Sequence, residues 1–128
     1  MIIDNTQDFF QKPLKNIDTI YSPRKFFGVS DGGYLYTNNL LKELLIVDES
    51  HIHSFHLLAR ADKKGSSFYN EFKEAEQRLT NQPIKKMSNL TNKILSSINY
   101  NRIKEKRKEN FKYLHDELAD TNLLENLD

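Results

Sequence analysis

The sequence predicts a mixed α/β chain, with short strands in residues 1–47 followed by about four α-helices in residues 48–128. Two observations support this division. Three of the four glycines, and the β-branched and aromatic runs typical of strands, lie before residue 48, whereas the long apolar patterns with a 3.6-residue period lie after it. The length of 128 residues fits one modest domain, so a complete large enzyme is excluded.

Three short strands are expected in the first part. Residues 2–4 are an apolar pair ending on an aspartate, residues 17–21 carry β-branched and aromatic side chains in near alternation, and residues 33–37 follow a glycine-rich turn. Residues 40–47 are apolar but short and mixed in period. They leave a helical turn and a buried strand equally open.

Four helices are expected in the second part. The first is capped by Asp48 or Ser50 and ends at residues 62–65, the second stops before residues 81–83, and the fourth runs from about residue 101 to 119. Apolar residues on one helical face support each prediction. In chain order, these stripes are Ile52, Phe55, Leu58 and Ala59; Phe68, Phe72, Ala75 and Leu79; Ile84, Met87, Leu90, Ile94 and Ile98; and Ile103, Phe111, Leu114 and Leu118.

Composition excludes several classes of function. The absence of cysteine excludes disulfides, thiolate metal sites and cysteine nucleophiles. With 19 basic and 18 acidic residues, the chain lacks the basic excess of nucleic-acid binders. The sequence contains no apolar run long enough to span a membrane and no basic-then-apolar signal peptide, so we expect a soluble, cytoplasmic protein.

Lys25 is the first candidate for chemistry. It lies between Pro23 and the pair Phe26-Phe27, surroundings that can desolvate an amine and favour its neutral, nucleophilic form. A lysine that forms a Schiff base must react in this neutral, nucleophilic form. The alternative is a surface lysine beside a hairpin turn formed by Asp31-Gly32.

A wider pattern surrounds this lysine. Ile2-Ile3-Asp4-Asn5-Thr6-Gln7, followed later by Lys25 and then by Asp31-Gly32-Gly33, resembles the cofactor segment of the DegT/DnrJ/StrS family of sugar aminotransferases. The resemblance implies a fragment of a fold-type-I transferase dependent on pyridoxal phosphate. It makes Lys25 the catalytic lysine that forms the internal aldimine, and Asp4 the carboxylate that keeps the pyridine nitrogen protonated.

The same resemblance assigns two further cofactor contacts. Gln7 corresponds to a residue near the cofactor ring. The family usually has a phosphate-binding serine five residues before the lysine, where this chain has Ile20, so Ser22 takes that role or the contact is lost. Arg24 is a candidate for a compensating phosphate contact, with a solvated surface arginine as the alternative.

The helical half extends the resemblance to about residue 118, through residues 57–60, 82–88 and 106–115. It implies an amino donor such as glutamate, a keto-sugar acceptor, and a homodimer or partner chain. Residues 1–47 would belong to the large cofactor-binding domain, and residues 48–128 would lead toward the small C-terminal domain. We therefore expect an incomplete aminotransferase. The alternative function is a non-catalytic remnant or helical interaction module that retains the lysine loop.

Two other features are read as structural. Of His51, His53 and His56, only the last two share a helix face, so two ligands would be available and no metal site is expected. The charged run at residues 104–112 is interrupted by Glu105 and Glu109. It fits a solvated helix face better than an RNA-binding surface.

Overall fold

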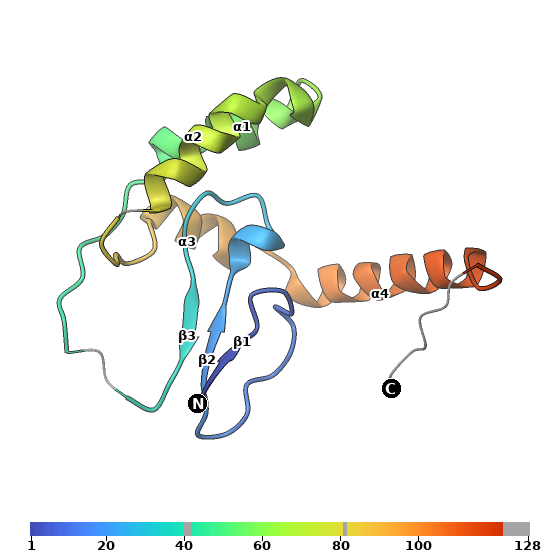
Figure 1. Cartoon of the computed structure of the whole chain (residues 1–128), viewed down its shortest axis with the longest axis horizontal. Coiled ribbons are helices and arrows are strands. Elements are labelled where there is room, and N and C mark those ends of the chain that lie inside the picture. The colour runs from blue at the N-terminus through green and yellow to red at the C-terminus, as the bar shows by residue number, and fades with distance from the viewer. Residues whose placement is uncertain (40–41, 81, 122–128) are drawn as a thin grey trace. The chain divides into compact units, whose positions relative to one another are not determined.

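The computed structural model describes residues 1–39, 42–80 and 82–121 (Figure 1). The chain divides into two compact units, Met1–Ser97 and Ile98–Asp128, which are described separately below. Within the described residues the chain is mixed α/β, with a three-stranded sheet and four α-helices, as the sequence predicts. None of the described helices is both long enough and apolar enough to cross a membrane.

The sheet has the order β1-β2-β3 (Figure 1). The three predicted strands are confirmed as β1 (Ile2–Asp4), β2 (Asp18–Tyr21) and β3 (Tyr34–Tyr36). β1 pairs with β2 in parallel, with Asp4 opposite Ile20, and β3 pairs with β2 in the antiparallel direction. Because parallel strands end at the same edge of a sheet, Asp4 lies beside the segment that follows β2.

The long loop between β1 and β2 is held against the sheet by an aromatic cluster. The ring of Phe9 lies 5.6 Å from that of Phe26 and 5.1 Å from that of Phe27, measured between centroids. The Tyr21 hydroxyl also donates a hydrogen bond of 3.0 Å to the carbonyl of Gln11. These contacts fix the loop next to the 3₁₀ turn Pro23–Lys25 that follows β2.

The first predicted helix is broken into short pieces. A 3₁₀ turn at His51–His53 precedes α1 (Phe55–Leu58), which continues into a second 3₁₀ turn at Ala59–Ala61. The reason lies in Ser54, whose hydroxyl donates to the carbonyl of Ser50 at 2.8 Å, while its backbone N–H bonds to His51. A serine side chain that takes the i−4 carbonyl competes with the regular helical ladder.

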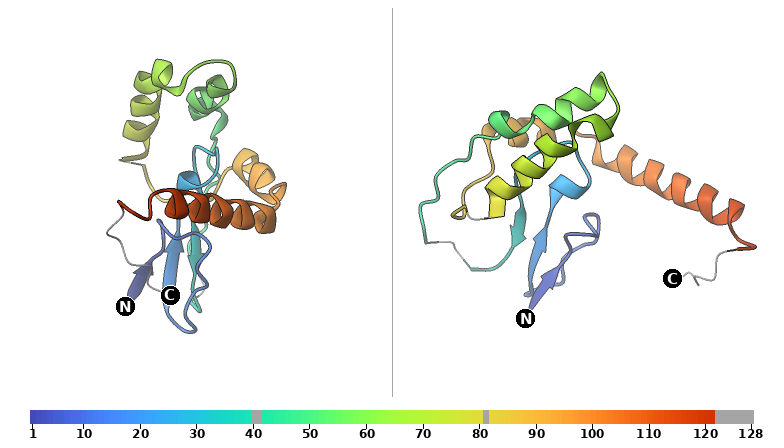
Figure 2. Two further views of the ribbon diagram at one scale, coloured as in Figure 1. Left: turned by 90° about the vertical axis from the view of Figure 1, so that its right-hand side faces the viewer. Right: turned by 45° about the horizontal axis from the view of Figure 1, so that its top comes forward.

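The second predicted helix is confirmed. It forms α2 (Tyr69–Thr80), which follows a 3₁₀ turn at Gly65–Phe68. α1 and α2 lie side by side in Figures 1 and 2 and contact each other. Ala75 is buried, and Phe72 and Leu79 are half-buried, so this apolar stripe faces the interior of the unit.

The third helix is shorter than predicted. α3 covers Asn89–Ser96, and the prediction that Ile84, Met87 and Ile98 belong to it is wrong. Lys86 instead forms a parallel bridge with Val47, supported by a hydrogen bond of 2.9 Å from its N–H to the carbonyl of Ile46. This pairing with a distant segment keeps residues 84–88 from joining the helix.

Residues 40–47, whose structure the sequence leaves open, are described only in part. Residues 40 and 41 lie outside the described residues, and the rest form no helix or strand apart from the bridge at Val47.

The second unit contains α4 (Tyr100–Glu117), which agrees with the fourth predicted helix. Asn99 caps it, because its side-chain oxygen accepts a hydrogen bond from the backbone N–H of Arg102 at 3.0 Å. None of the residues of α4 is buried, and the rings of Phe111 and His115 stack at 5.9 Å.

Candidate functional site

The edge where β1 and β2 end brings Asp4 and Lys25 together. Asp4 is the last residue of β1, and Lys25 is the last residue of the 3₁₀ turn that follows β2. Thr6 lies between them. Its backbone N–H donates to Asp4 Oδ1 at 2.9 Å, and Lys25 Nζ donates to Thr6 Oγ1 at 3.3 Å. The two residues predicted to carry the chemistry therefore share one neighbour.

Thr6 was missed by the sequence analysis as a site residue. An aspartate followed two residues later by a small polar residue is typical of a turn in which the carboxylate accepts the later N–H. That signal was present in the sequence, and it identifies Thr6 as the residue that orients Asp4.

Electrostatics keep Asp4 ionised. The backbone N–H of Thr6, its side chain and the charge of Lys25 lower the pKa of Asp4, and together they outweigh the opposing effect of desolvation. A carboxylate of this kind presents a fixed negative charge at neutral pH.

Of the two interpretations of Lys25, the structure supports the surface lysine and not the desolvated one. Lys25 is exposed, because the neighbouring rings of Phe26 and Phe27 pack against Phe9 and are themselves half-buried. Its amine is therefore accessible to a ligand from solvent.

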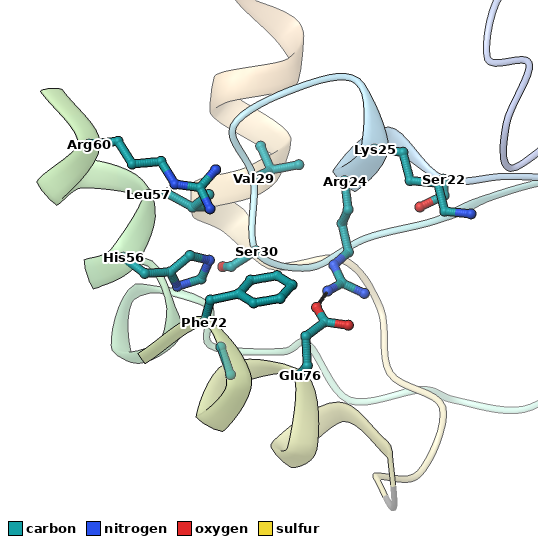
Figure 3. Close-up of a pocket in the computed structure, with 11 residues that line it drawn as sticks. Ser22, Arg24, Lys25, Val29, Ser30, His56, Leu57, Arg60, Phe72 and Glu76 are labelled. Carbon is teal, nitrogen blue, oxygen red and sulfur yellow. Dashed lines mark hydrogen bonds and ion pairs between the residues drawn. The ribbon is translucent and has the colours of Figure 1, made fainter. Parts of the chain in front are cut away.

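The other two predicted cofactor contacts lie in different places. Ser22 is half-buried and lines a cavity of about 260 Å³ together with Lys25 (Figure 3). Gln7 is exposed in the turn after β1 and is not among the residues that line this cavity. The structure thus brings Ser22 and Lys25 to one cavity and leaves Gln7 outside it.

The cavity is built from four segments of the first unit. The 3₁₀ turn after β2 supplies Arg24, residues 29–30 supply a buried valine and serine, α1 and the turn after it supply His56 and Arg60, and α2 supplies Phe72 and Glu76 (Figure 3). Arg24 and Glu76 form an ion pair across it. The sequence alone does not group these residues, because they come from segments far apart in the chain.

The turn Asp31-Gly32-Gly33 serves the fold. Asp31 is 5% exposed, and its Oδ2 accepts a hydrogen bond of 2.7 Å from the backbone N–H of Ser88, the N-cap of α3. Its Oδ1 accepts hydrogen bonds from the hydroxyls of Ser88 and Thr91. Asp31 therefore holds the start of α3. Asp31-Gly32 lies in the connection between the antiparallel strands β2 and β3, but the Asp31 carboxylate is buried and bonded to the start of α3.

Asp31 belongs to a buried polar cluster, which we define as Ser30, Asp31, Ser50, Ser54, Ser88 and Thr91. All six side chains are buried. Ser50 Oγ and Ser88 Oγ lie 2.7 Å apart, and Ser30 Oγ and Ser54 Oγ lie 2.9 Å apart. The cluster joins the loop after β2 to the segments that begin α1 and α3.

The histidines do not form one group. His56 is buried beside Phe72, His51 is exposed, and His53 Nδ1 lies 3.3 Å from Nη1 of Arg78. In the part of the chain that the structure describes, no group of three or more histidine, aspartate or glutamate side chains is arranged to hold a metal ion.

The fold and the site define a mixed α/β chain with a lysine and an ionised carboxylate at the carboxyl ends of two parallel strands. Comparison with known proteins adds no relative, since no family model, no curated protein and no solved structure matches the chain.

Proposed function

We propose that this chain forms the lysine and carboxylate part of a pyridoxal-phosphate site and that it is part of a sugar aminotransferase of the DegT/DnrJ/StrS type. The observation that carries the proposal is the meeting of Asp4 and Lys25 at Thr6. In open α/β sheets, ligands bind beyond the carboxyl ends of parallel strands, which is where these residues lie. The family resemblance of residues 2–7 and 25–33 supports the same assignment.

The chain's own residues fit such a cofactor. Asp4, with its lowered pKa, would face the pyridine nitrogen and hold its proton. Lys25, an exposed residue, would hold the cofactor through its aldehyde carbon and, once freed from it, would move a proton away from the substrate's amino carbon. When bound, pyridoxal phosphate supplies an electron sink for that carbon.

The remaining parts of the proposal rest on the resemblance. Ser22, in the cavity beside Lys25, would contact the cofactor phosphate, and Gln7 would approach the ring. The amino donor would be a compound such as glutamate and the acceptor a keto-sugar. Pairing with a second copy, or with another chain, would complete the site.

Reductive trapping tests the proposal. The chain is incubated with pyridoxal phosphate, reduced with borohydride and digested, and pyridoxyl-lysine is located by mass spectrometry. We expect labelling concentrated on Lys25, lost in Lys25→Arg, and weakened in Asp4→Asn and Thr6→Val. Thr6→Val retains the N–H that bonds Asp4 but removes the hydroxyl that binds Lys25.

The matched control is Lys12→Arg, which alters an exposed lysine in the loop between β1 and β2. It should leave the labelling of Lys25 unchanged. Labelling scattered equally over exposed lysines, with no dependence on Asp4, would contradict the proposal.

A second candidate, the helical interaction module, is favoured by α4. Phe111 and Leu114 of α4, and Leu118 at its C-terminal cap, are 60%, 56% and 51% exposed and lie at the spacing of one helical face. If this candidate is correct, the chain associates in solution, Leu114→Ser abolishes the association, and Lys25 shows no selective labelling. Selective labelling of Lys25 separates the two functions, and the solution mass of both forms, measured by light scattering, shows whether the apolar face of α4 carries the association.

A further inference from the structure

β3 is an edge strand of the sheet. The strand order is β1-β2-β3, so β3 pairs with β2 along one side only (Figure 1). Its three residues, Tyr34, Leu35 and Tyr36, are all exposed. Charged side chains or prolines usually protect an edge strand from pairing with another chain, and β3 contains neither. The strand therefore offers an apolar edge that a further strand can join.

The backbone of Leu35 faces away from β2. The carbonyl of Ile20 accepts a hydrogen bond of 2.9 Å from the N–H of Asn5, so Ile20 bonds toward β1 and not toward β3. Leu35 lies opposite Ile20 in the antiparallel ladder, which makes the two a pair without hydrogen bonds between them. The N–H and C=O of Leu35 consequently point to the outer side of β3, where no described residue bonds to either group.

A groove of about 680 Å³ lies along this strand, within the usual volume range of ligand pockets. Apolar side chains from three segments line it: Leu35, Leu45, Ile84 and Met87. The segment before α3 is held in place, because the N–H of Lys86 donates to Ile46 at 2.9 Å and its carbonyl accepts from Asp48 at 3.0 Å. An apolar groove beside an open strand edge suits the side chains of an extended peptide.

The groove also carries an excess of positive charge. Three lysines line it, namely Lys42, Lys85 and Lys86. Among the described residues, two carboxylates offset part of this charge, since Glu43 lines the groove and Asp48 pairs with Lys85 at 2.8 Å. Three positive and two negative charges leave a net charge of about +1. A second copy of β3 would bring a like excess, whereas a peptide with carboxylates would complement it.

We propose that this groove binds an extended segment of a partner protein, rich in apolar residues and carboxylates, which joins the sheet as a strand beside β3. Main-chain hydrogen bonds to Leu35 hold the segment, and the apolar lining accommodates its alternate side chains. Its carboxylates lie near Lys42 and Lys86. The groove contains neither Asp4 nor Lys25, so this proposal does not depend on the proposed cofactor site.

The test measures the binding of a defined probe to the full chain by fluorescence anisotropy. The probe is a fluorescein-labelled peptide of about eight residues, the length of an ordinary strand, in which valine and glutamate alternate. We expect saturable binding, and weaker binding of the same peptide with lysine in place of glutamate. A peptide with methylated backbone nitrogens cannot donate to β3 and should bind about tenfold more weakly. Absence of saturable binding, or equal binding of the methylated peptide, would overturn the proposal.

Leu35 provides a matched pair of variants. Leu35→Pro removes the outward N–H and spares the bonds to β2, because an edge strand tolerates proline where its N–H faces away from the ladder. Leu35→Ala shortens the same side chain but keeps the N–H. We expect Leu35→Pro to bind the probe about fivefold more weakly than Leu35→Ala. Equal affinities in two folded variants contradict pairing with β3. Circular dichroism verifies folding, and the methylated peptide tests the same bond if Leu35→Pro does not fold.

The charge of the groove is tested separately. Lys86→Glu should weaken binding of the acidic probe about threefold or more. Lys12→Glu makes the same change in net charge on an exposed lysine outside the groove, and should leave the affinity unchanged. An equal loss in both variants would mean that the probe responds to the overall charge of the chain, and the groove would be overturned as its site.

Light scattering distinguishes the peptide from a second copy of the chain. If β3 pairs with β3 of another copy, the chain is a dimer that excess probe does not bind or dissociate, and the proposal is overturned. A complex of one probe per chain supports it. Probe binding without selective labelling of Lys25 would sustain the groove and overturn the proposed function, and the reverse pair of results would do the opposite.

Discussion

Asp4 and Asp31 occupy contrasting surroundings. Asp4 is exposed at the end of β1, where its bonded partner is the nearby Thr6 and its charged neighbour is Lys25. Asp31 is 5% exposed, and both of its carboxylate oxygens accept hydrogen bonds from Ser88, with Thr91 as a further donor. One carboxylate is open to a ligand, and the other is fully used by the fold.

The difference shows how to separate a binding residue from a structural one. A buried carboxylate that already accepts three hydrogen bonds gains little from a ligand and would lose the start of α3 by moving. An exposed carboxylate at a strand end, kept ionised by one turn, can accept a new partner without disturbing the fold. We therefore expect substitution of Asp31 to lower the stability, and substitution of Asp4 to weaken the pyridoxyl labelling of Lys25.

The largest expected effect is on the buried member. Asp31→Asn replaces one acceptor oxygen with an amide NH2 group, so a buried donor of Ser88 or Thr91 faces another donor. We expect a loss of about 3 kcal/mol in the free energy of unfolding. Urea denaturation followed by circular dichroism measures it.

The exposed member supplies the control. Asp4→Asn should shift the urea midpoint far less than Asp31→Asn and should weaken the pyridoxyl labelling of Lys25. Equal destabilisation by the two substitutions would remove the distinction between them.

Local patterns predicted much of the fold. The strands, α2 and α4 follow from alternation or from apolar stripes within single segments, which act over neighbouring residues. The breaks around α1 and the late start of α3 do not, because they depend on Ser54 and on the bridge between Val47 and Lys86. In these two places, contacts with other residues prevent helix formation even though the apolar residues recur with a helical period.

The candidate site follows the same rule. Asp4 and Lys25 were grouped in advance because both follow short strands in a pattern that resembles a known family, and the parallel pairing of β1 and β2 brings them together. The cavity residues His56, Arg60 and Glu76 were not grouped, because only the packing of α1 and α2 brings them to Arg24. The sequence left both a desolvated and a surface Lys25 open, since it does not show where the neighbouring aromatic rings pack.

A smaller effect is expected from the glycine next to Asp31. Gly32 has φ of +99°, and an added Cβ would lie 2.9 Å from Cε of Met87. Gly32→Ala therefore strains the backbone and displaces Met87, for a loss of about 2 kcal/mol. Thermal unfolding measures this loss.

Gly28 provides a matched position in the loop after Lys25. An added Cβ there meets nothing within 4 Å, so Gly28→Ala should change the stability by less than about 0.5 kcal/mol. A greater loss in Gly28→Ala than in Gly32→Ala would place the rigid part of this loop near the lysine instead of near the buried cluster.

The smallest predicted effect is on the pH dependence of stability, which should differ between His56 in the cavity and Asp4 at the strand edge. Desolvation, with the charges of Arg60 and Arg24, lowers the pKa of His56 below its usual 6.5. Just below pH 6.5 the unfolded chain therefore binds a proton at His56 that the folded chain does not, so acidification favours unfolding. The lowered pKa of Asp4 acts only near and below 3.8, where its stabilising contribution is lost as the folded carboxylate takes up a proton.

A series of melting temperatures from pH 7.5 down to pH 5 tests this separation. His56→Gln should melt with a shallower decline across that range, whatever packing it loses against Phe72 at every pH. His51→Gln removes an exposed histidine and should keep the decline. Asp4→Asn should also keep it, because the contribution of Asp4 changes with pH only near and below 3.8, outside this range. If Asp4→Asn, rather than His56→Gln, flattens the decline between pH 7 and 5, the strand edge controls the pH response and the contrast between the two regions is reversed.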